Sequence, residues 1–408
     1  MKKPSFQSVL TLQCALLGGS FVMHFQSASA ANAAPPTSPA VTAGVVYERI
    51  SPISGQATEK GIFGNSPESP DGKTIVYVAF DWKAQPRPGI PSKSGFSKGA
   101  LYICDSNLKN HVKIRDLNRA RWHDGAMQIW LDNDTLAYMD YLPARNCYVT
   151  YVVRKNGDQV LGPLEGSLGH GDTPNNSVLL IVDGKKYPKG SSLGRRGLYL
   201  YKAGTVTQVV DLEKDLGKLR AQYKDSDEPA DWMIAHAELS PKGTYISIRL
   251  DPKKGQEKVV TCRADGSDVR PFNTPAKPLH QQWYDDTTIF GHKRGGGPDH
   301  LQCQRWDRDG KYIETLAGPG NHMGLSPDRR YLVSESIYTT DPVVMKLFRT
   351  GSTEPLAILM NVPQGPIWVN GTHVNPAFSQ DGRFVYFNMP VDGAPQLHRI
   401  DLSTWIGK

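Results

Sequence analysis

Six of the 11 histidines in the chain recur once per repeat, each at or near the start of a short β-like segment. They are His123, His170, His236, His280, His322 and His373. Strand-rich repeats of about 40–50 residues are typical of a β-propeller, in which the first strand of every blade lines the central channel. One residue type repeated on those strands forms a ring, and a ring of imidazoles indicates metal binding or proton transfer.

His280, His322 and His373 would come from adjacent blades, so their side chains can converge on one divalent ion. Three imidazoles with one oxygen ligand suit zinc or manganese, and calcium is left open. The competing interpretation is structural, because a single histidine on an inner strand more often only donates a hydrogen bond. Six histidines in register favour function, since structure alone needs no repeated imidazole. The histidines away from these strands are expected at the surface: His111, His292, His300 and His398.

Seven strand-rich units can be marked from Asn65 onward, and Asp-Gly pairs separate many of their strands. Such a pair between apolar segments is the strongest short-range signal of a hairpin. The last unit lacks an outer strand after residues 397–401, whereas residues 44–50 form a lone strand-like segment. Pairing the two would close the ring and remove two exposed sheet edges. The sequence therefore predicts an all-β, seven-bladed β-propeller over residues 44–408, closed by an N-terminal strand. The Asp-Gly pairs are Asp71-Gly72, Asp183-Gly184, Asp265-Gly266, Asp309-Gly310 and Asp381-Gly382.

The N-terminal residues are not expected to belong to the fold. Two lysines precede an apolar run over residues 9–25, and small residues at 28–30 offer a cleavage site, so residues 1–30 are predicted to be a secretory signal peptide. Residues 31–43, rich in Ala, Pro, Thr and Ser, are expected to be a flexible lead-in. The protein is therefore expected in the periplasm or outside the cell. No later run approaches the ~18–20 apolar residues of a membrane span.

The charges of the chain are well mixed and give a formal net charge of +7. This balance suits an anionic ligand, but aromatic residues do not alternate with basic runs, so nucleic acid is not an expected partner. We expect a monomer. Cys104 and Cys147 are about one blade apart, as are Cys262 and Cys303. Disulfides between neighbouring blades and buried free thiols are equally compatible with this spacing.

Several segments resemble those of known propeller families. Turns of the type Ser69-Pro70-Asp71-Gly72-Lys73 resemble the repeats of the Tol-system periplasmic propeller. Other segments are similar to those of propeller polysaccharide lyases, which include the oligogalacturonate lyases and their ulvan lyase relatives. This second resemblance covers most of the chain and implies a lyase that acts on an acidic polysaccharide. The segments that carry it are His280 with Trp283 and residues 285–291, residues 320–328, and residues 370–376.

The resemblance also implies roles for individual residues. In the oligogalacturonate lyases, histidines on the later blades hold a divalent metal, typically manganese, and a Gln-x-x-His-x-His segment supplies several ligands. Its counterpart here is Asn370-x-x-His373-x-Asn375, so asparagine replaces the family residue at two positions. The resemblance implies Asn370 as a fourth ligand beside the three histidines of the later blades. The family's catalytic histidine on the fourth blade matches His236.

Lyases of acidic polysaccharides break a C–O bond by β-elimination, which sets three tasks. The uronate carboxylate must be neutralised, a base must remove the proton from the neighbouring carbon, and an acid or water must protonate the leaving oxygen. An arginine or a metal suits the first task, and histidine suits the other two. The candidate catalytic residues are His123, His170, Arg196 and His236.

The first hypothesis is therefore an exported propeller that cleaves a uronate-containing polysaccharide or oligosaccharide by β-elimination. The alternative is a non-catalytic periplasmic propeller that binds a protein or glycan partner, which needs neither convergent histidines nor a metal. A serine hydrolase is disfavoured. Gly190-Ser191-Ser192-Leu193-Gly194 matches the G-x-S-x-G motif, but the strand and helix that a nucleophile elbow needs do not flank it.

Overall fold

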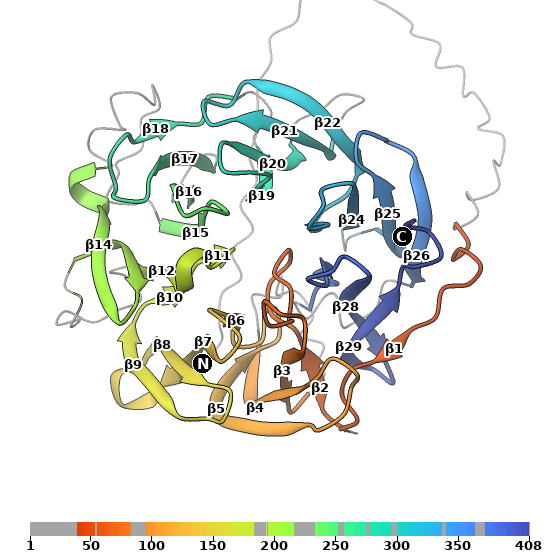
Figure 1. Ribbon diagram of the computed structural model, residues 1–408, viewed down its shortest axis with the longest axis horizontal. Helices are drawn as coiled ribbons and strands as arrows, with labels where there is room; N and C mark the ends of the chain where they lie inside the picture. Colours follow the sequence, from red (N-terminus) through yellow and green to blue (C-terminus); the bar gives the residue numbers. More distant parts are fainter. Residues whose placement is uncertain are drawn as a thin grey trace, which may run out of the picture. The chain divides into compact units, whose positions relative to one another are not determined.

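The computed structural model describes residues 39–53, 55–82, 95–182, 193, 195–215, 233–251, 257–274, 278–294, 300–336, 340–363 and 372–407. The strands of these residues form seven sheets that follow one another around a ring (Figure 1). Six sheets have four strands and one has five. The expected all-β, seven-bladed propeller is confirmed. The expected signal peptide, residues 1–30, lies outside the described residues. Within the described residues, no helix is long and apolar enough to cross a membrane.

Apart from one short parallel pair in the fourth sheet, each blade is an antiparallel sheet whose strands are ordered outward from the ring centre. The first three blades comprise β2 (Ala57–Glu59), β3 (Thr74–Phe80), β4 (Phe96–Asp105) and β5 (Val112–Arg121); β6 (Ile129–Trp130), β7 (Thr135–Leu142), β8 (Cys147–Arg154) and β9 (Gln159–Glu165); and β10 (Ser167–Leu168), β12 (Ser177–Val182), β13 (Gly197–Lys202) and β14 (Thr205–Asp211). The fourth sheet comprises β11 (His170–Gly171), which pairs in parallel with β15 (Met233–Leu239), followed by β16 (Tyr245–Asp251), β17 (Lys258–Arg263) and β18 (Arg270–Pro271). The last three comprise β19 (Pro278–Trp283), β20 (Thr288–Lys293), β21 (Gln302–Asp307) and β22 (Tyr312–Pro319); β23 (Met323–Leu325), β24 (Tyr331–Glu335), β25 (Val343–Arg349) and β26 (Pro355–Val362); and β27 (Ala377–Phe378), β28 (Phe384–Val391), β29 (Ala394–Asp401) and β1 (Glu48–Arg49). Two short 3-10 helices are η1 (Pro143–Arg145) and η2 (Pro174–Asn176).

The second strand of a blade is almost wholly buried, because the neighbouring blades cover both of its faces. β3 and β12 therefore read as continuous apolar runs, TIVYVAF and SVLLIV, rather than as alternating patterns. Tight turns join these strands. Four of the five expected Asp-Gly turns lie in the described residues, and their glycines have φ between +69° and +87°. This left-handed backbone is the conformation that glycine adopts without a steric penalty.

The N-terminal strand closes the ring as the sequence predicts, although it is shorter than the expected 44–50. β1 pairs antiparallel with β29, with Glu48 opposite Arg399. The Ile50 N–H donates to the Leu397 carbonyl at 3.0 Å, and the Arg399 Nε lies 2.7 Å from the Glu48 carboxylate. The last part of the expected lead-in is also bound, because the Thr42 N–H donates to the Ile358 carbonyl at 3.0 Å. Both ends of the chain therefore complete the last blades.

Removing residues 1–50 should destabilise the whole propeller relative to a chain that lacks residues 1–38. The deletion loses several backbone hydrogen bonds, each worth ~1 kcal/mol, and exposes the edge of β29. In a chain of this size, each kcal/mol lost from the free energy of unfolding lowers Tm by at most roughly 2–4 °C. Several lost hydrogen bonds should therefore lower Tm by about 5 °C or more. Thermal unfolding followed by circular dichroism measures it. Equal melting of the two truncated chains would show that β1 does not hold the ring closed.

Two expectations about buried groups are corrected or settled. His292 and His398 were expected at the surface, but they are 0% and 5% exposed. They lie on β20 and β29, where side chains on both faces of the strand are covered by other blades. The expectation was wrong because distance from the inner strands does not imply exposure.

The four cysteines at positions 104, 147, 262 and 303 are free and buried, so the free-thiol interpretation is confirmed over the disulfides. Burial raises the pKa of the Cys104 thiol to about 12, which keeps it protonated.

Candidate active site

The six recurring histidines lie at the beginning of the innermost strands. His236 belongs to β15 and His280 to β19, His170 begins β11, and the other three precede β6, β23 and β27. All inner strands start at the same end of their blades, so the imidazoles gather at that end of the ring. We call the space that these six side chains surround the histidine chamber.

β-bulges aim two of the histidines. The pairing of β15 with β16 shifts register between Ile234 and His236, and the pairing of β19 with β20 shifts between Leu279 and Gln282. His280 has a φ of +52°, which residues other than glycine rarely adopt. A bulge turns a side chain away from the regular alternation of a strand and is frequent beside active sites. The backbone is therefore locally adapted to place these imidazoles.

Four of the imidazoles form a chain of contacts across the later blades and blade two. The ring centroids of His280 and His322 are 4.2 Å apart, those of His322 and His373 are 4.7 Å apart, and those of His373 and His123 are 4.2 Å apart. His322 and His373 are buried, whereas the His123 side chain is 27% exposed. His280 is half-buried. This group joins residues 250 positions apart in the chain, which only closure of the ring can bring together.

His170 and His236 form a separate pair, with ring centroids 4.4 Å apart. His170 is 7% exposed and His236 is half-buried. Arg249 on β16 lies directly opposite His236 in the sheet. Its guanidinium binds both carboxylate oxygens of Asp251, at 3.0 and 3.1 Å. The pair is therefore next to a positive charge that already has an acidic partner.

An aromatic side chain fills the middle of the histidine chamber. Phe63 is 3% exposed, and its ring centroid lies 4.8 Å from that of His322 and 5.0 Å from that of His280. The centroids of His236 and His170 lie 6.2 and 6.4 Å away. Phe63 thus touches both groups of imidazoles and fixes their spacing by packing rather than by hydrogen bonds.

Phe63 belongs to the segment between β2 and β3, which projects toward the middle of the ring (Figure 1). The fully buried Lys60 ammonium donates to the carbonyls of Ile62 at 2.6 Å and Asn65 at 3.1 Å. Burial lowers the pKa of Lys60 to about 7. Gly64 has a φ of +74°, and a Cβ there would lie 2.1 Å from the Gln282 side-chain oxygen. Another residue there would be strained at this φ and would displace the Gln282 side chain.

Sequence reasoning missed this segment, because the first blade was expected to begin at Asn65, whereas its inner strand is β2. The signal in the sequence was the apolar pair Ile62-Phe63 between Gly61 and Gly64, outside any strand.

Three histidines are arranged so that they could hold one metal ion. The candidate ligand atoms of His123, His322 and His373 all lie within 4.8 Å of one another. Two imidazole nitrogens on one tetrahedral zinc ion, each ~2.1 Å from the metal, are ~3.4 Å apart, so a pair at the full 4.8 Å must close by roughly 1.4 Å. This group differs from the expected one: His123 takes part, His280 only touches His322, and Asn370 lies outside the described residues. Asn375 is buried, and its side-chain amide donates to the His123 carbonyl at 3.0 Å.

A buried carboxylate orients one histidine of this group. His322 and Glu335 are each 1% exposed, and the His322 Nδ1 is hydrogen-bonded to the Glu335 carboxylate. A carboxylate that accepts from one ring nitrogen fixes the tautomer and leaves the other nitrogen for a metal. The donor set and its support therefore fit a divalent ion.

Burial keeps four of the six chamber imidazoles neutral. It lowers the pKa of His170 to about 3, although Asp124 opposes this shift. Burial, reinforced by neighbouring imidazoles, also holds the pKa values of His236, His280 and His373 well below the usual range. Neutral imidazoles offer a lone pair, which both a metal ligand and a general base need.

The pKa shift of His170 makes a prediction about stability. Its folded pKa, about 3, lies below the unfolded value of 6.5, so the stabilisation is present above pH 6.5 and is lost as pH falls toward 3. In that window each such histidine lowers the free energy of unfolding by ~1.4 kcal/mol per pH unit. The variant His170→Gln should therefore show a slope smaller by about that amount between roughly pH 6 and 4. Denaturant unfolding at several pH values measures the slope, and identical slopes in the two proteins would mean that His170 is protonated in the fold.

The expected catalytic arginine lies farther out than the histidines. Arg196 is half-buried and directly precedes β13, the third strand of its blade. Two other arginines lie closer to the imidazoles. Arg249 faces His236, and the Arg121 Nε lies 3.2 Å from the carboxylate of Asp124, the neighbour of His123. Nothing in the sequence distinguished these two from other arginines.

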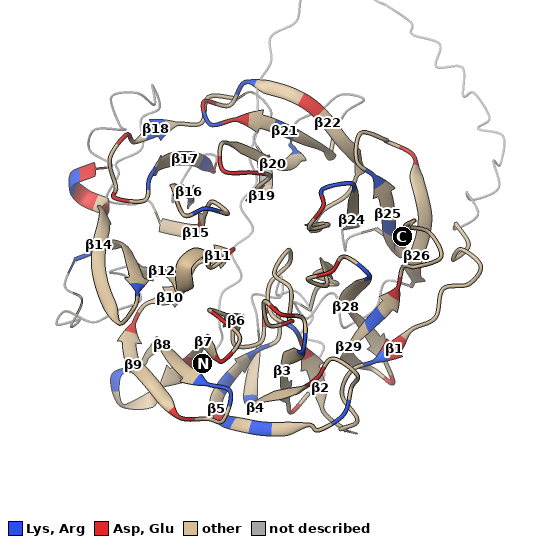
Figure 2. Ribbon diagram, viewed as in Figure 1, with Lys and Arg blue, Asp and Glu red and all other residues tan. Residues whose placement is uncertain are grey.

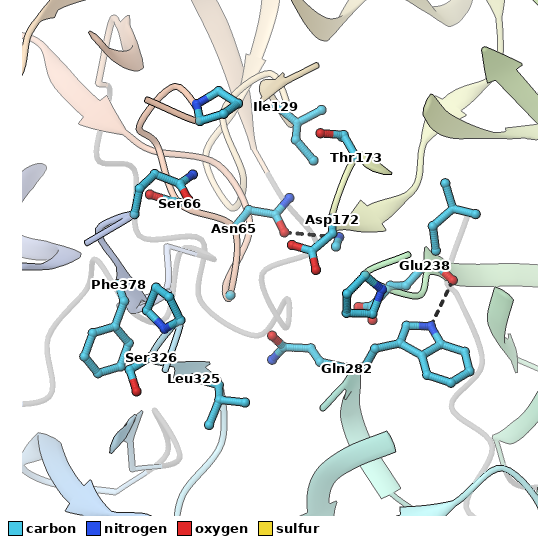
Figure 3. A pocket seen from close by; sticks show the side chains of 18 of the residues that line it. Asn65, Ser66, Ile129, Asp172, Thr173, Glu238, Gln282, Leu325, Ser326 and Phe378 are labelled. Atoms are coloured by element: carbon cyan, nitrogen blue, oxygen red, sulfur yellow. Dashed lines mark hydrogen bonds between the residues drawn. The ribbon is translucent and has the colours of Figure 1, made fainter. Parts of the chain in front are cut away.

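A cavity of about 340 Å³ lies at the other end of the inner strands, lined by residues of all seven blades. On the first blade the lining residues follow Phe63 in sequence, and on the other blades they follow a chamber histidine. Figure 3 shows Asp172 and Gln282 projecting toward the middle of this cavity, with Glu238 at its side. Burial raises the pKa of Glu238, which is 2% exposed, whereas Asp172 is exposed. Arg329 also lines this cavity. The histidine chamber is the candidate site because it gathers the imidazoles, which can bind a metal or accept a proton.

The chain is similar to solved propellers at low sequence identity. An oligogalacturonate lyase from Vibrio parahaemolyticus matches with a TM-score of 0.60 and 13% identity, over 90% of this chain and 97% of that chain. An oligogalacturonate lyase in complex with manganese matches with a TM-score of 0.55 and 15% identity, over 88% and 96%. A puromycin-hydrolyzing peptidase from Mycobacterium tuberculosis matches with a TM-score of 0.54 and 12% identity, over 88% of this chain but 54% of that chain. No family model matches the sequence, and no curated protein does. At these identities the likeness shows the fold alone.

Proposed function

We propose that the protein is an exported lyase that cleaves a uronate-containing polysaccharide or oligosaccharide by β-elimination in the histidine chamber. The observation that carries the proposal is the convergence of six imidazoles at one end of the ring. Four of them pack around one buried aromatic ring, and four are kept neutral by burial. A binding scaffold does not need such a group. The likeness in fold to two oligogalacturonate lyases, one solved with manganese, supports the same reaction class.

His123, His322 and His373 would hold one divalent ion. Bound there, the ion would neutralise the uronate carboxylate and so make the adjacent C–H bond more acidic. Three nitrogen ligands favour zinc or manganese over calcium, because calcium prefers oxygen ligands. Asn370 remains a predicted additional ligand, and His280 would support His322 from 4.2 Å away.

His236 would remove the proton next to the carboxylate. The sequence left His236 and His123 as alternatives, and the place of His123 among the candidate ligands favours His236. The low pKa of His236 keeps it in the base form at neutral pH. Water would protonate the leaving oxygen, because burial lowers the pKa of His170 to about 3 and leaves it without an acidic proton at neutral pH. His170 would instead position His236, whose ring centroid lies 4.4 Å from its own. Arg249 and the more distant Arg196 are candidates to offset the charge that develops on the substrate.

The test is incubation of the protein with a panel of uronate polymers while the near-ultraviolet absorbance of the unsaturated product is followed. Cleavage of at least one polymer is expected, and a metal chelator should abolish it until zinc or manganese is restored. Absence of product from every uronate polymer, in protein shown to contain its metal, would overturn the proposal. The alternative of a non-catalytic propeller that binds a protein or glycan would then be favoured.

A further inference from the structure

A guanidinium group is clamped between two aromatic rings at the boundary of the first two blades. The Arg119 Cζ lies 3.4 Å from the ring centroid of Tyr141 and 4.1 Å from that of Phe96, a side chain that is 48% exposed. The buried Asp140 carboxylate accepts from the backbone N–H groups of Arg119 at 3.0 Å and Tyr141 at 2.7 Å. The backbone of β5 and that of β7 are thus joined where the guanidinium sits.

The positive charge of Arg119 has no acidic partner among the described residues, in contrast to Arg121 and Arg249. Aromatic rings cover the faces of a guanidinium but leave its N–H donors in the plane between them. Those donors match the two oxygens of a carboxylate. The clamp therefore presents a fixed, uncompensated cation that suits an anionic group.

This clamp is continuous with the histidine chamber. Arg121 is two residues farther along β5, so it lies on the same face of the strand with its Cα ~6.6 Å from that of Arg119. The next residues of the chain enter the chamber, where Asp124 binds Arg121 at 3.2 Å beside His123. Figure 2 shows basic residues recurring along β5. Burial raises the pKa of Tyr148, against the effect of Arg121 and Arg119, so a protonated hydroxyl accompanies the two arginines.

The end of β5 is rigidly held. The indole of Trp122 packs against Trp82 at 4.8 Å, and its Nε1 donates to the Ser97 hydroxyl at 3.0 Å. Its backbone N–H donates to the Gly95 carbonyl at 2.9 Å, and its carbonyl accepts from the Thr372 hydroxyl at 3.1 Å. Thr372 precedes His373, one of the candidate metal ligands. Its bond to Trp122 therefore fixes the end of β5, with Arg119 and Arg121, relative to the candidate metal site. Such fixed donors lose little entropy when they bind a ligand.

We propose that Arg119, with Arg121, binds the carboxylate of a second uronate residue, which flanks the residue held in the histidine chamber. The inference rests on the proposed function and names its substrate class: an oligomer or polymer with uronates next to one another, not an isolated uronate. Arg119 would then determine preference for chain length, and it would not take part in the elimination itself.

The test compares binding of galacturonate and digalacturonate by calorimetry to the wild-type protein and to Arg119→Met, which keeps the apolar stem between the rings but removes the charge. A charge-assisted hydrogen bond is worth roughly 10- to 100-fold in affinity. We expect Arg119→Met to weaken binding of the dimer by about that factor and binding of the monomer by less than about twofold. Arg119→Lys should recover part of the loss, because an ammonium cannot bind a carboxylate bidentately. Arg349→Ala is the matched control, since Arg349 lies over the ring of Tyr331 on blade six.

Equal wild-type affinity for monomer and dimer would overturn the proposal, and so would an equal loss for both ligands in Arg119→Met. Melting temperatures confirm that each variant is folded. The two proposals fail separately. If the length dependence is found but no uronate polymer yields unsaturated product, the arginine site stands and the lyase fails. If product forms without any length dependence, the lyase stands and the arginine site fails.

Discussion

Replacing His322 with alanine is expected to empty the metal site and abolish cleavage. His322 is one of the three candidate ligands, and its ligand atom lies within 4.8 Å of those of His123 and His373. Protein purified without chelator should contain close to one zinc or manganese ion per chain, and His322→Ala close to none. Elemental analysis measures the content, with His300→Ala as the control, because His300 is exposed and away from the chamber. Equal metal content in wild type and His322→Ala would show that these imidazoles do not hold an ion.

A milder change, at the Glu335 carboxylate that is hydrogen-bonded to His322, should weaken metal binding without abolishing it. Glu335→Gln keeps the shape of the side chain but no longer fixes the imidazole tautomer with a negative charge. Loss of such a partner typically lowers metal affinity 10- to 100-fold, so the variant should retain the site with weaker binding. Competition with a chelator of known affinity measures the change. A Glu335→Gln variant that binds the metal as tightly as the wild type would mean that the His322–Glu335 pair is only structural.

Replacing His236 with alanine is expected to lower kcat by ~10²- to 10⁴-fold, the usual contribution of a general base. The melting temperature should change little, because His236 is half-buried and on a bulge whose backbone hydrogen bonds remain. Steady-state kinetics on the best substrate of the panel, together with thermal unfolding, separates the two effects. His236→Ala that retains full activity, or loses it only in parallel with its fold, would remove His236 from the mechanism and favour the binding propeller.

The fold was predictable because its signals are local. The Asp-Gly turns and the apolar runs of β3 and β12 each report on a few neighbouring residues, and their repetition gives the number of blades. Closure by β1 was predictable for a different reason: a lone strand at one end and an incomplete blade at the other can satisfy each other's backbone groups. The buried positions of His292 and His398 were not predictable in this way, because blade-to-blade packing covers both faces of a strand.

The site was predictable only in part. The repeat identified all six chamber histidines, since one position in each unit recurs. It did not show which three would lie close together, because that depends on the bulges at His236 and His280 and on the ring of Phe63 between them. Asp124, Glu335 and the arginine clamp gave no signal, since single charged residues are common on any strand and only the folded ring shows their partners.

The pairing of β1 with β29 has a consequence for the order of folding. Glu48 and Arg399 are 351 residues apart in the chain, yet they are bonded neighbours. The first strand to be synthesised therefore has no partner until the last one has been made, and the six blades between them can assemble before the ring closes. Until the ring closes, β1 and the outer edge of β29 are unpaired, and a strand of another molecule could pair with either. The speed of this last step thus sets how long the newly made protein is exposed to aggregation.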